Sequence, residues 1–218
     1  MVLSFKTPIF FGLFLILVSV GILFPAAFSY AAVVHKVPFT SQAPFGDWSE
    51  PYKNFCEEAS IAMVAHFIWG VPLSSKIADL EMRIIQKFEQ LVFGRAIDNN
   101  AEDVALVLKT LYGFKNVFIK EISSEKDIIG QLDTGKVLIA PVAGRMLKNP
   151  YFTPPGPIYH ILVIKGYDEV KKTFITNDPG TRRGENFSYG QKLLYEAIHD
   201  WNGGKVMGGK KMVVSVGK

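Results

Sequence analysis

The sequence predicts an α+β fold in which a helical first half packs on an antiparallel sheet formed by the second half. Helical periodicity dominates between residues 56 and 132, and short apolar runs bounded by turn residues dominate after residue 136. Helices and strands do not alternate regularly, so a parallel βαβ sheet is not expected. With 218 residues and 49% hydrophobic content, the chain can bury one sizeable core, and residues 32–218 are predicted to form a single domain.

An uncharged apolar segment precedes this domain. Lys6 is the only charged residue of the first 31. The positive start, the apolar run and the small-x-small site Ser29-Tyr30-Ala31 predict a secretory signal peptide over residues 1–31. The run also approaches the roughly 20 residues that span a bilayer, so a retained membrane anchor through residues 7–29 is the alternative. In both cases the domain is predicted to be secreted or anchored at the outer face of the cytoplasmic membrane.

The first predicted helix begins at Cys56, the only cysteine of the chain. Its apolar residues recur three and four positions apart, and Gly70 with Pro72 supplies the stop signal. These apolar residues are Ala59, Met63, Val64, Phe67 and Ile68. A thiol in the first turn lies near the positive end of the helix dipole, which favours the thiolate. A lone cysteine is often only a small buried hydrophobe, but an unpaired thiol in an exported protein also suggests a reactive group.

The other elements follow from the same periodicities. Further helices are predicted over residues 75–93, 100–112, 124–132 and 189–201, with Ser188 as the cap of the last. Strands are predicted over residues 33–42, 116–122, 136–142, 160–165, 172–177 and 211–216, the first of them broken at Pro38. The cysteine helix is expected to pack on the antiparallel sheet that these strands form.

Charge and ligand spacing argue against two classes of function. The net charge is +4 and the basic residues are scattered, so no nucleic-acid partner is predicted. A single cysteine rules out a disulfide within the chain, and the four histidines lack the spacing of a zinc site. Neither a metal nor an organic cofactor is predicted.

A cysteine nucleophile needs a base, and His160 is the best candidate among the histidines. His66 lies ten residues along the cysteine helix, roughly 15 Å from Cys56 at 1.5 Å per residue. His199 is predicted to end a helix, where a histidine commonly serves the helix dipole. His35 has no evident orienting partner. His160, in contrast, opens an apolar strand that is followed by a hairpin.

That hairpin is predicted to bring Asp178 to His160. With a three-residue loop over residues 169–171, counting back along both strands places Leu162 opposite Asp178, and His160 becomes its diagonal neighbour. Diagonal pairs lie roughly 7–8 Å apart, within reach of a hydrogen bond between carboxylate and imidazole. An aspartate before Pro-Gly is also common in ordinary turns, so the prediction depends on the strand pairing.

These blocks resemble a known family. Gln42, the helix opened by Cys56, His160 followed by Gly166-Tyr167-Asp168, and Asn177-Asp178-Pro179 are together similar to the papain-like cysteine peptidases. The resemblance is strongest to the bacteriocin-processing type and its stand-alone, double-glycine-peptidase-like relatives, and it spans about residues 36 to 201. It implies a papain-like fold with Cys56 as nucleophile, His160 as general base and acid, Asp178 as the group that orients His160, and Gln42 as the oxyanion donor.

One departure from the family pattern concerns the residues after the cysteine. The family usually has Gly-Pro there, whereas this chain has Glu57-Glu58. Both carboxylates suit the positive end of a helix dipole, yet they oppose thiolate formation at the neighbouring Cys56. Two hypotheses follow: either Cys56 is less acidic than in the relatives, or Glu57 faces a cationic substrate.

The resemblance therefore implies an exported cysteine peptidase or amide hydrolase that acts on peptides or proteins through an acyl-enzyme. Its main alternative, favoured by the departure at Glu57-Glu58, is a catalytically inactive, surface-displayed peptide-binding module. A membrane-anchored processing factor for another exported protein is a third reading, and the acceptor, water or an amine, is left open.

Overall fold

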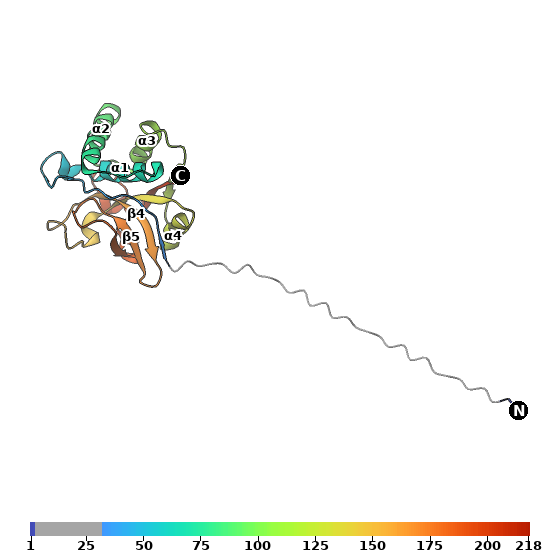
Figure 1. Cartoon of the computed structure of the whole chain (residues 1–218). Coiled ribbons are helices and arrows are strands. Elements are labelled where there is room, and N and C mark those ends of the chain that lie inside the picture. The colour runs from blue at the N-terminus through green and yellow to red at the C-terminus, as the bar shows by residue number, and fades with distance from the viewer. Residues whose placement is uncertain (3–31) are drawn as a thin grey trace.

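The computed structural model describes residues 1–2 and 32–218 (Figure 1). The predicted leader falls on residues 3–31, outside the described residues, so both the signal peptide and the membrane anchor stay predictions. None of the helices formed by the described residues is long and apolar enough to cross a membrane.

Within residues 32–218, the centre of the fold is one seven-stranded sheet in which every pair of neighbouring strands is antiparallel. Its strand order is β2-β7-β3-β4-β5-β6, and β1 pairs with β4. The strands are β1 Ala32–Val34, β2 Val117–Glu121, β3 Val137–Val142, β4 His160–Asp168, β5 Thr173–Asn177, β6 Phe187–Gly190 and β7 Met212–Val216. The most buried strands, β3 and β4, lie side by side at its centre.

Helices cover both faces of this sheet. They are α1 Cys56–Trp69, α2 Ser75–Phe93, α3 Ala101–Thr110, α4 Glu125–Asp133 and α5 Gln191–Ala197. One apolar core joins α1 and α3 to one face of the sheet, through residues such as Ile161 and Val163 of β4. A second core joins α4 and α5 to the opposite face, through Leu162 and Ile164. The alternation of β4 between two buried faces explains why its sequence is continuously apolar.

The cysteine helix α1 is buried almost all round, as its small residues allow. Every residue from Cys56 to Phe67 is buried, because the sheet covers one side of α1 while α2 and α3 cover others (Figure 1). The helix ends where the sequence predicts, at Gly70, whose φ of 70° needs the left-handed region that glycine adopts without strain. The predicted α+β class, with this helix packed on an antiparallel sheet, is confirmed.

Two predicted elements are wrong in their extent. The last helix does not begin after Ser188, because Phe187 to Gly190 form β6, whose residues pair with β5. The helix that follows, α5, ends at Ala197, and Ile198 forms a bridge with Val142 of β3. His199 therefore lies outside the helix. The strand predicted over residues 33–42 is limited to β1, because only its beginning finds a pairing partner in β4.

The hairpin between β4 and β5 differs from the prediction at its loop but agrees with it near the site. Asp168 pairs with Thr173, so four residues connect the strands, not three. A β-bulge at Lys165 then adds one residue to β4 and shifts the register back. As a result Val163 pairs with Asn177, which is the register that the three-residue loop predicts at this end.

Candidate active site

Cys56 follows the buried residue Phe55 at the start of α1. Phe55, which is 1% exposed, packs with Ala59 of α1 and with Met82 of α2, and this small core fixes where the helix begins. Cys56 is 8% exposed and lines a cleft of about 630 Å³. Gln42 and His160 line the same cleft, so three of the four predicted site residues lie around one cavity.

The fourth residue, Asp178, is hydrogen-bonded to His160. The distance from His160 Nε2 to Asp178 Oδ1 is 2.8 Å, and the side chains are 2% and 0% exposed. His160 is the first residue of β4 and Asp178 follows β5 directly, so the hairpin brings them together as predicted. Because Nε2 is engaged by the carboxylate, Nδ1 is the ring nitrogen left to face a thiol.

Asp178 is held as an anion by several donors. It accepts hydrogen bonds from Tyr189 Oη at 2.5 Å, from the Gly180 N–H at 2.9 Å and from Asn149 Nδ2 at 3.2 Å. Burial alone raises the pKa of Asp178, but the His160 ring and the bonds from Tyr189 and Gly180 outweigh burial, and the net pKa is lowered. Tyr189 and Asn149 are missed by sequence reasoning, since neither belongs to a recognisable motif.

The His160 ring is packed between two neighbours. Phe152 meets it edge-on, with 5.4 Å between ring centroids. Gly180 lies against the ring so closely that an added Cβ would stand 2.9 Å from His160 Cε1. The imidazole is therefore fixed by contact as well as by Asp178.

Gln42 is connected to both parts of the site. Its backbone N–H donates to the Pro179 carbonyl at 3.0 Å, next to Asp178. Its side-chain Nε2 donates to the Tyr52 carbonyl at 2.9 Å, just before the cysteine helix. The amide thus lies at the cleft in a defined orientation with a second N–H, and its predicted role as oxyanion donor stays a prediction.

The Cys56 thiol is hydrogen-bonded to the side chain of the next residue, Glu57. Sγ donates to Glu57 Oε2 at 3.0 Å, and in the described part of the chain no hydrogen bond joins the thiol to His160. Burial, and then the charge and hydrogen bond of Glu57, raise the pKa of Cys56 well above its usual value, while a backbone hydrogen bond involving Ile161 acts in the opposite direction. The helix dipole favours the thiolate, whereas burial and Glu57 act against it, which is the direction predicted for a carboxylate next to the cysteine.

The two glutamates are not solvated charges at a helix end. Glu57 is 3% and Glu58 is 1% exposed, and both lie near the fully buried Glu89 of α2. Burial, followed by the charge of Glu89, raises the pKa of Glu58 well above its usual value. Burial, followed by the charge of Glu57, raises the pKa of Glu89 to about 9. Glu89 is therefore mainly protonated at neutral pH, and burial favours the neutral form of Glu58 as well.

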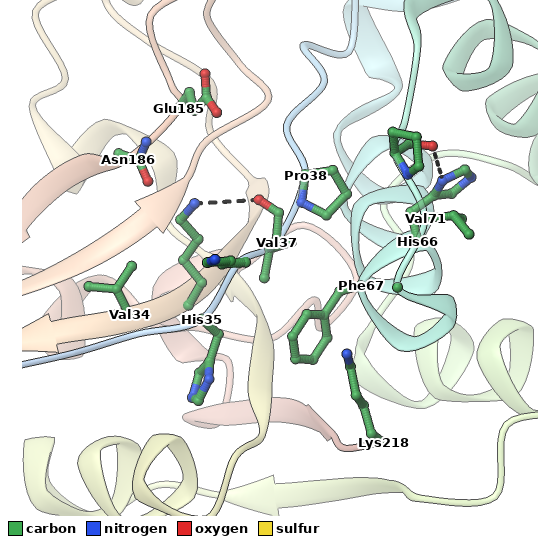
Figure 2. A pocket seen from close by; sticks show the side chains of 14 residues that line it. Val34, His35, Val37, Pro38, His66, Phe67, Val71, Glu185, Asn186 and Lys218 are labelled. Atoms are coloured by element: carbon green, nitrogen blue, oxygen red, sulfur yellow. Dashed lines mark hydrogen bonds between the residues drawn. The ribbon is translucent and has the colours of Figure 1, made fainter.

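A second cavity, of about 590 Å³, lies near the other end of α1 (Figure 2). It is lined by β1 and the chain that follows it, by Glu185 and Asn186, and by Lys218. Its residue His66 uses both ring nitrogens, Nδ1 toward the Pro72 carbonyl at 2.8 Å and Nε2 toward Glu81 at 2.9 Å. Neither nitrogen of His66 is free to act as a base, so this histidine is not an alternative to His160.

Among residues 1–2 and 32–218, no cluster of histidine, cysteine or acidic side chains is arranged to hold a metal.

Comparison with known proteins identifies the family and the fold. Residues 34–202 match the sequence profile described as the Peptidase_C39 like family. The chain belongs to the Peptidase_C39 like family. A crystal structure described as that of a C39-like peptidase from Bacillus anthracis has the same fold, with a TM-score of 0.54 over 86% of this chain and 98% of that chain, at 14% identity. No match to a curated protein is found. Family membership indicates a peptidase with a peptide substrate, and it confirms the resemblance predicted from Gln42, Cys56, His160 and Asp178.

Proposed function

We propose that this protein is an exported cysteine peptidase that uses Cys56, His160 and Asp178. The observation that carries the proposal is the buried hydrogen bond of 2.8 Å between Asp178 and His160, because His160 lines the cleft that the only thiol of the chain also lines. Membership in the Peptidase_C39 like family supports the reaction class. Export rests on the apolar leader alone.

The chemistry follows from the order of these three groups. The thiol proton moves to His160 Nδ1, and Sγ forms a bond to the carbonyl carbon of the peptide. His160 then gives this proton to the leaving amine as the C–N bond breaks, which leaves a thioester on Cys56. Water, deprotonated by His160, then forms a bond to the thioester carbon. The C–S bond breaks, the acyl group leaves as a carboxylic acid, and His160 returns the proton to sulfur. Asp178 stays ionised throughout and stabilises the imidazolium, as its lowered pKa allows.

The oxyanion of the tetrahedral intermediate needs donors at the same place. We assign this role to Gln42 Nε2 and to the backbone N–H of Cys56, because the first N–H groups of a helix have no partner within the helix. A preorganised donor of this kind contributes about 3–4 kcal/mol to the stability of the transition state. The bond from Gln42 to the Tyr52 carbonyl supports the assignment, since it holds the amide beside the first turn of α1.

The direct test is peptide cleavage by the full-length protein. A mixed peptide library is incubated with the wild type and with Cys56→Ala and His160→Ala, and the products are identified by mass spectrometry. Products that require both residues are expected. Cleavage that persists in Cys56→Ala would refute the proposal.

A second measurement concerns the leader. The mature N-terminus of the protein from an expressing cell, determined by mass spectrometry, separates a cleaved signal peptide from a retained anchor.

The second candidate is a peptide-binding module without turnover. It is favoured by one observation, the hydrogen bond that ties the Cys56 thiol to Glu57 and away from His160. Peptides that bind the wild type and Cys56→Ala equally, and are cut by neither, would select this candidate.

A further inference from the structure

The Cys56 thiol donates its hydrogen bond to Glu57, whereas the proposed reaction needs it to pass its proton to His160. A thiol that donates to a carboxylate at 3.0 Å is a resting group, because the proton it must lose to His160 is engaged elsewhere. The base itself is ready, since Asp178 occupies Nε2 and leaves Nδ1 available. The nucleophile Cys56 and the base His160 therefore line the same cleft, but each is hydrogen-bonded to a different carboxylate.

Glu57 is held rigidly in this position. It is 3% exposed, and its second oxygen, Oε1, accepts the Asn99 backbone N–H at 3.2 Å. Lys53, the only lysine or arginine that lines the cleft within the described residues, is paired with Glu50 at 2.7 Å. Among the described residues that line the cleft, no free lysine or arginine compensates the Glu57 carboxylate, and its Oε2 accepts the thiol proton.

The groups around Glu57 favour its neutral form. Burial is the main cause that raises the pKa of Glu57; the Cys56 hydrogen bond and the backbone N–H groups oppose it, and the charge of Asp98 adds to it. The titratable groups that face this region are Cys56 and Glu58 of α1, Glu89 of α2, Asp98 and Asp103 before and in α3, and Tyr159, His160 and Asp200. Among them, the charge of Asp98 adds to burial in disfavouring a negative charge on Glu57, and the buried carboxyl groups of Glu58 and Glu89 supply no positive charge to offset it.

We propose that Glu57 is a positioning residue that holds Cys56 as a resting thiol while ionised, and releases it to His160 when Glu57 takes up a proton. This inference rests on the proposed function. The balance is one proton taken from solvent: it binds Glu57 Oε2, whose O–H can then donate to sulfur, while the thiol proton passes to His160 Nδ1. The product is a thiolate–imidazolium pair beside a neutral carboxylic acid. Mild acid thus favours the reactive form.

Replacement of Glu57 by glutamine imitates the protonated state. The amide has no charge and can donate an N–H to sulfur, and its oxygen can still accept the Asn99 N–H. Glu58→Gln is the matched control, because it replaces the next buried carboxyl on the same helix with an amide without removing the group that touches sulfur. Glu57→Asp keeps the charge but draws it back by one methylene.

The test measures the rate of iodoacetamide labelling of Cys56 in the full-length protein from about pH 5 to about pH 9. Labelling reports the thiolate fraction at a single thiol. We expect Glu57→Gln to label about tenfold faster than wild type or more at neutral pH, which corresponds to a fall in thiol pKa of about one unit. Glu58→Gln is expected to stay close to wild type and Glu57→Asp to lie between. Wild-type labelling should also show a reactive shoulder on the acid side.

The outcomes distinguish this inference from the proposed function. Glu57→Gln labelling as slow as wild type, with His160→Ala slower than both, would overturn the role of Glu57 alone. Labelling that is indifferent to His160→Ala in wild type and in Glu57→Gln would overturn the Cys56–His160 pair. The wild-type profile needs no variant, so a rate that only rises toward alkaline pH contradicts the inference even if Glu57→Gln fails to fold.

Discussion

The hydroxyl of Tyr189 donates to the carboxylate that orients His160, and its removal in Tyr189→Phe perturbs the site without touching the cleft. The Tyr189 Oη to Asp178 Oδ2 distance is 2.5 Å, and the two side chains belong to residues that are 3% and 0% exposed. A hydrogen bond to a charged group contributes about 1.5–3 kcal/mol to stability. In the variant, Asn149 loses its 2.7 Å hydrogen bond to the same hydroxyl but keeps its 3.2 Å hydrogen bond to Asp178. We therefore expect a loss of about 2 kcal/mol, or about 4–8 °C in Tm for a domain of this size.

The loss should depend on pH in a defined direction. The pKa of Asp178 is lowered in the folded protein, so its charged form contributes stability above its unfolded value of about 3.9, and this contribution is lost as pH falls through the lowered folded value. Tyr189 is one cause of that lowered pKa. The cost of Tyr189→Phe is thus expected to be full at neutral pH and smaller in acid.

The assay is urea unfolding followed by circular dichroism, at neutral pH and at about pH 3. Tyr195→Phe is the matched control, because the Tyr195 hydroxyl donates at 2.8 Å to the uncharged Ser123 carbonyl at the surface. It should cost about 1 kcal/mol or less at both values of pH. A Tyr189→Phe loss no larger than that of the control, or equal at both values of pH, would refute the reasoning.

Three further predictions concern the cleft and the buried acids. Gly180→Ala places a Cβ 2.9 Å from His160 Cε1, so the ring must move, and peptide turnover is expected to fall about 100-fold while denaturant unfolding shows a loss of about 1–3 kcal/mol. Gln42→Ala should lower kcat about 100- to 1000-fold and leave the rate of Cys56 labelling unchanged, whereas equal losses in both would mean a structural role. Glu89 has a folded pKa of about 9, raised above its unfolded value, so its contribution to stability is full below about pH 4.3 and is lost as pH rises toward 9. Glu89→Gln should remove a slope of up to about 1.4 kcal/mol per pH unit from the unfolding free energy, and an unchanged slope would show that Glu89 is ionised in the fold.

Periodicity in the sequence predicts the elements that carry the site, because those elements satisfy local rules. The helix opened by Cys56 ends at a glycine in the left-handed region, and the strand opened by His160 is apolar throughout because both of its faces are covered. The register of the hairpin is predicted correctly at Asn177 although the loop is one residue longer, because the bulge at Lys165 compensates. The geometry of a pair such as His160–Asp178 can thus be anticipated from strand counting.

Features that depend on tertiary contacts are not visible in this way. Ser188 resembles a helix cap, yet the following Tyr189 belongs to a strand because it pairs with Phe174 of β5 and bonds to Asp178. Glu58 resembles a solvated charge at a helix N-terminus, and only the packing of α2 over it makes it a buried acid. Asn149 has no local signal at all, because its partners are 29 and 40 residues away in the chain.

The central claim is that Cys56 forms a covalent acyl intermediate that His160 helps to make and to resolve. Intact-mass spectrometry of the full-length protein, quenched in acid during reaction with an activated peptide ester, tests this directly. The account predicts one acyl adduct per chain on Cys56 in the wild type, none in Cys56→Ala, and slower formation in His160→Ala. Ester turnover by Cys56→Ala at the wild-type rate, or an adduct mapped to another residue, would contradict it.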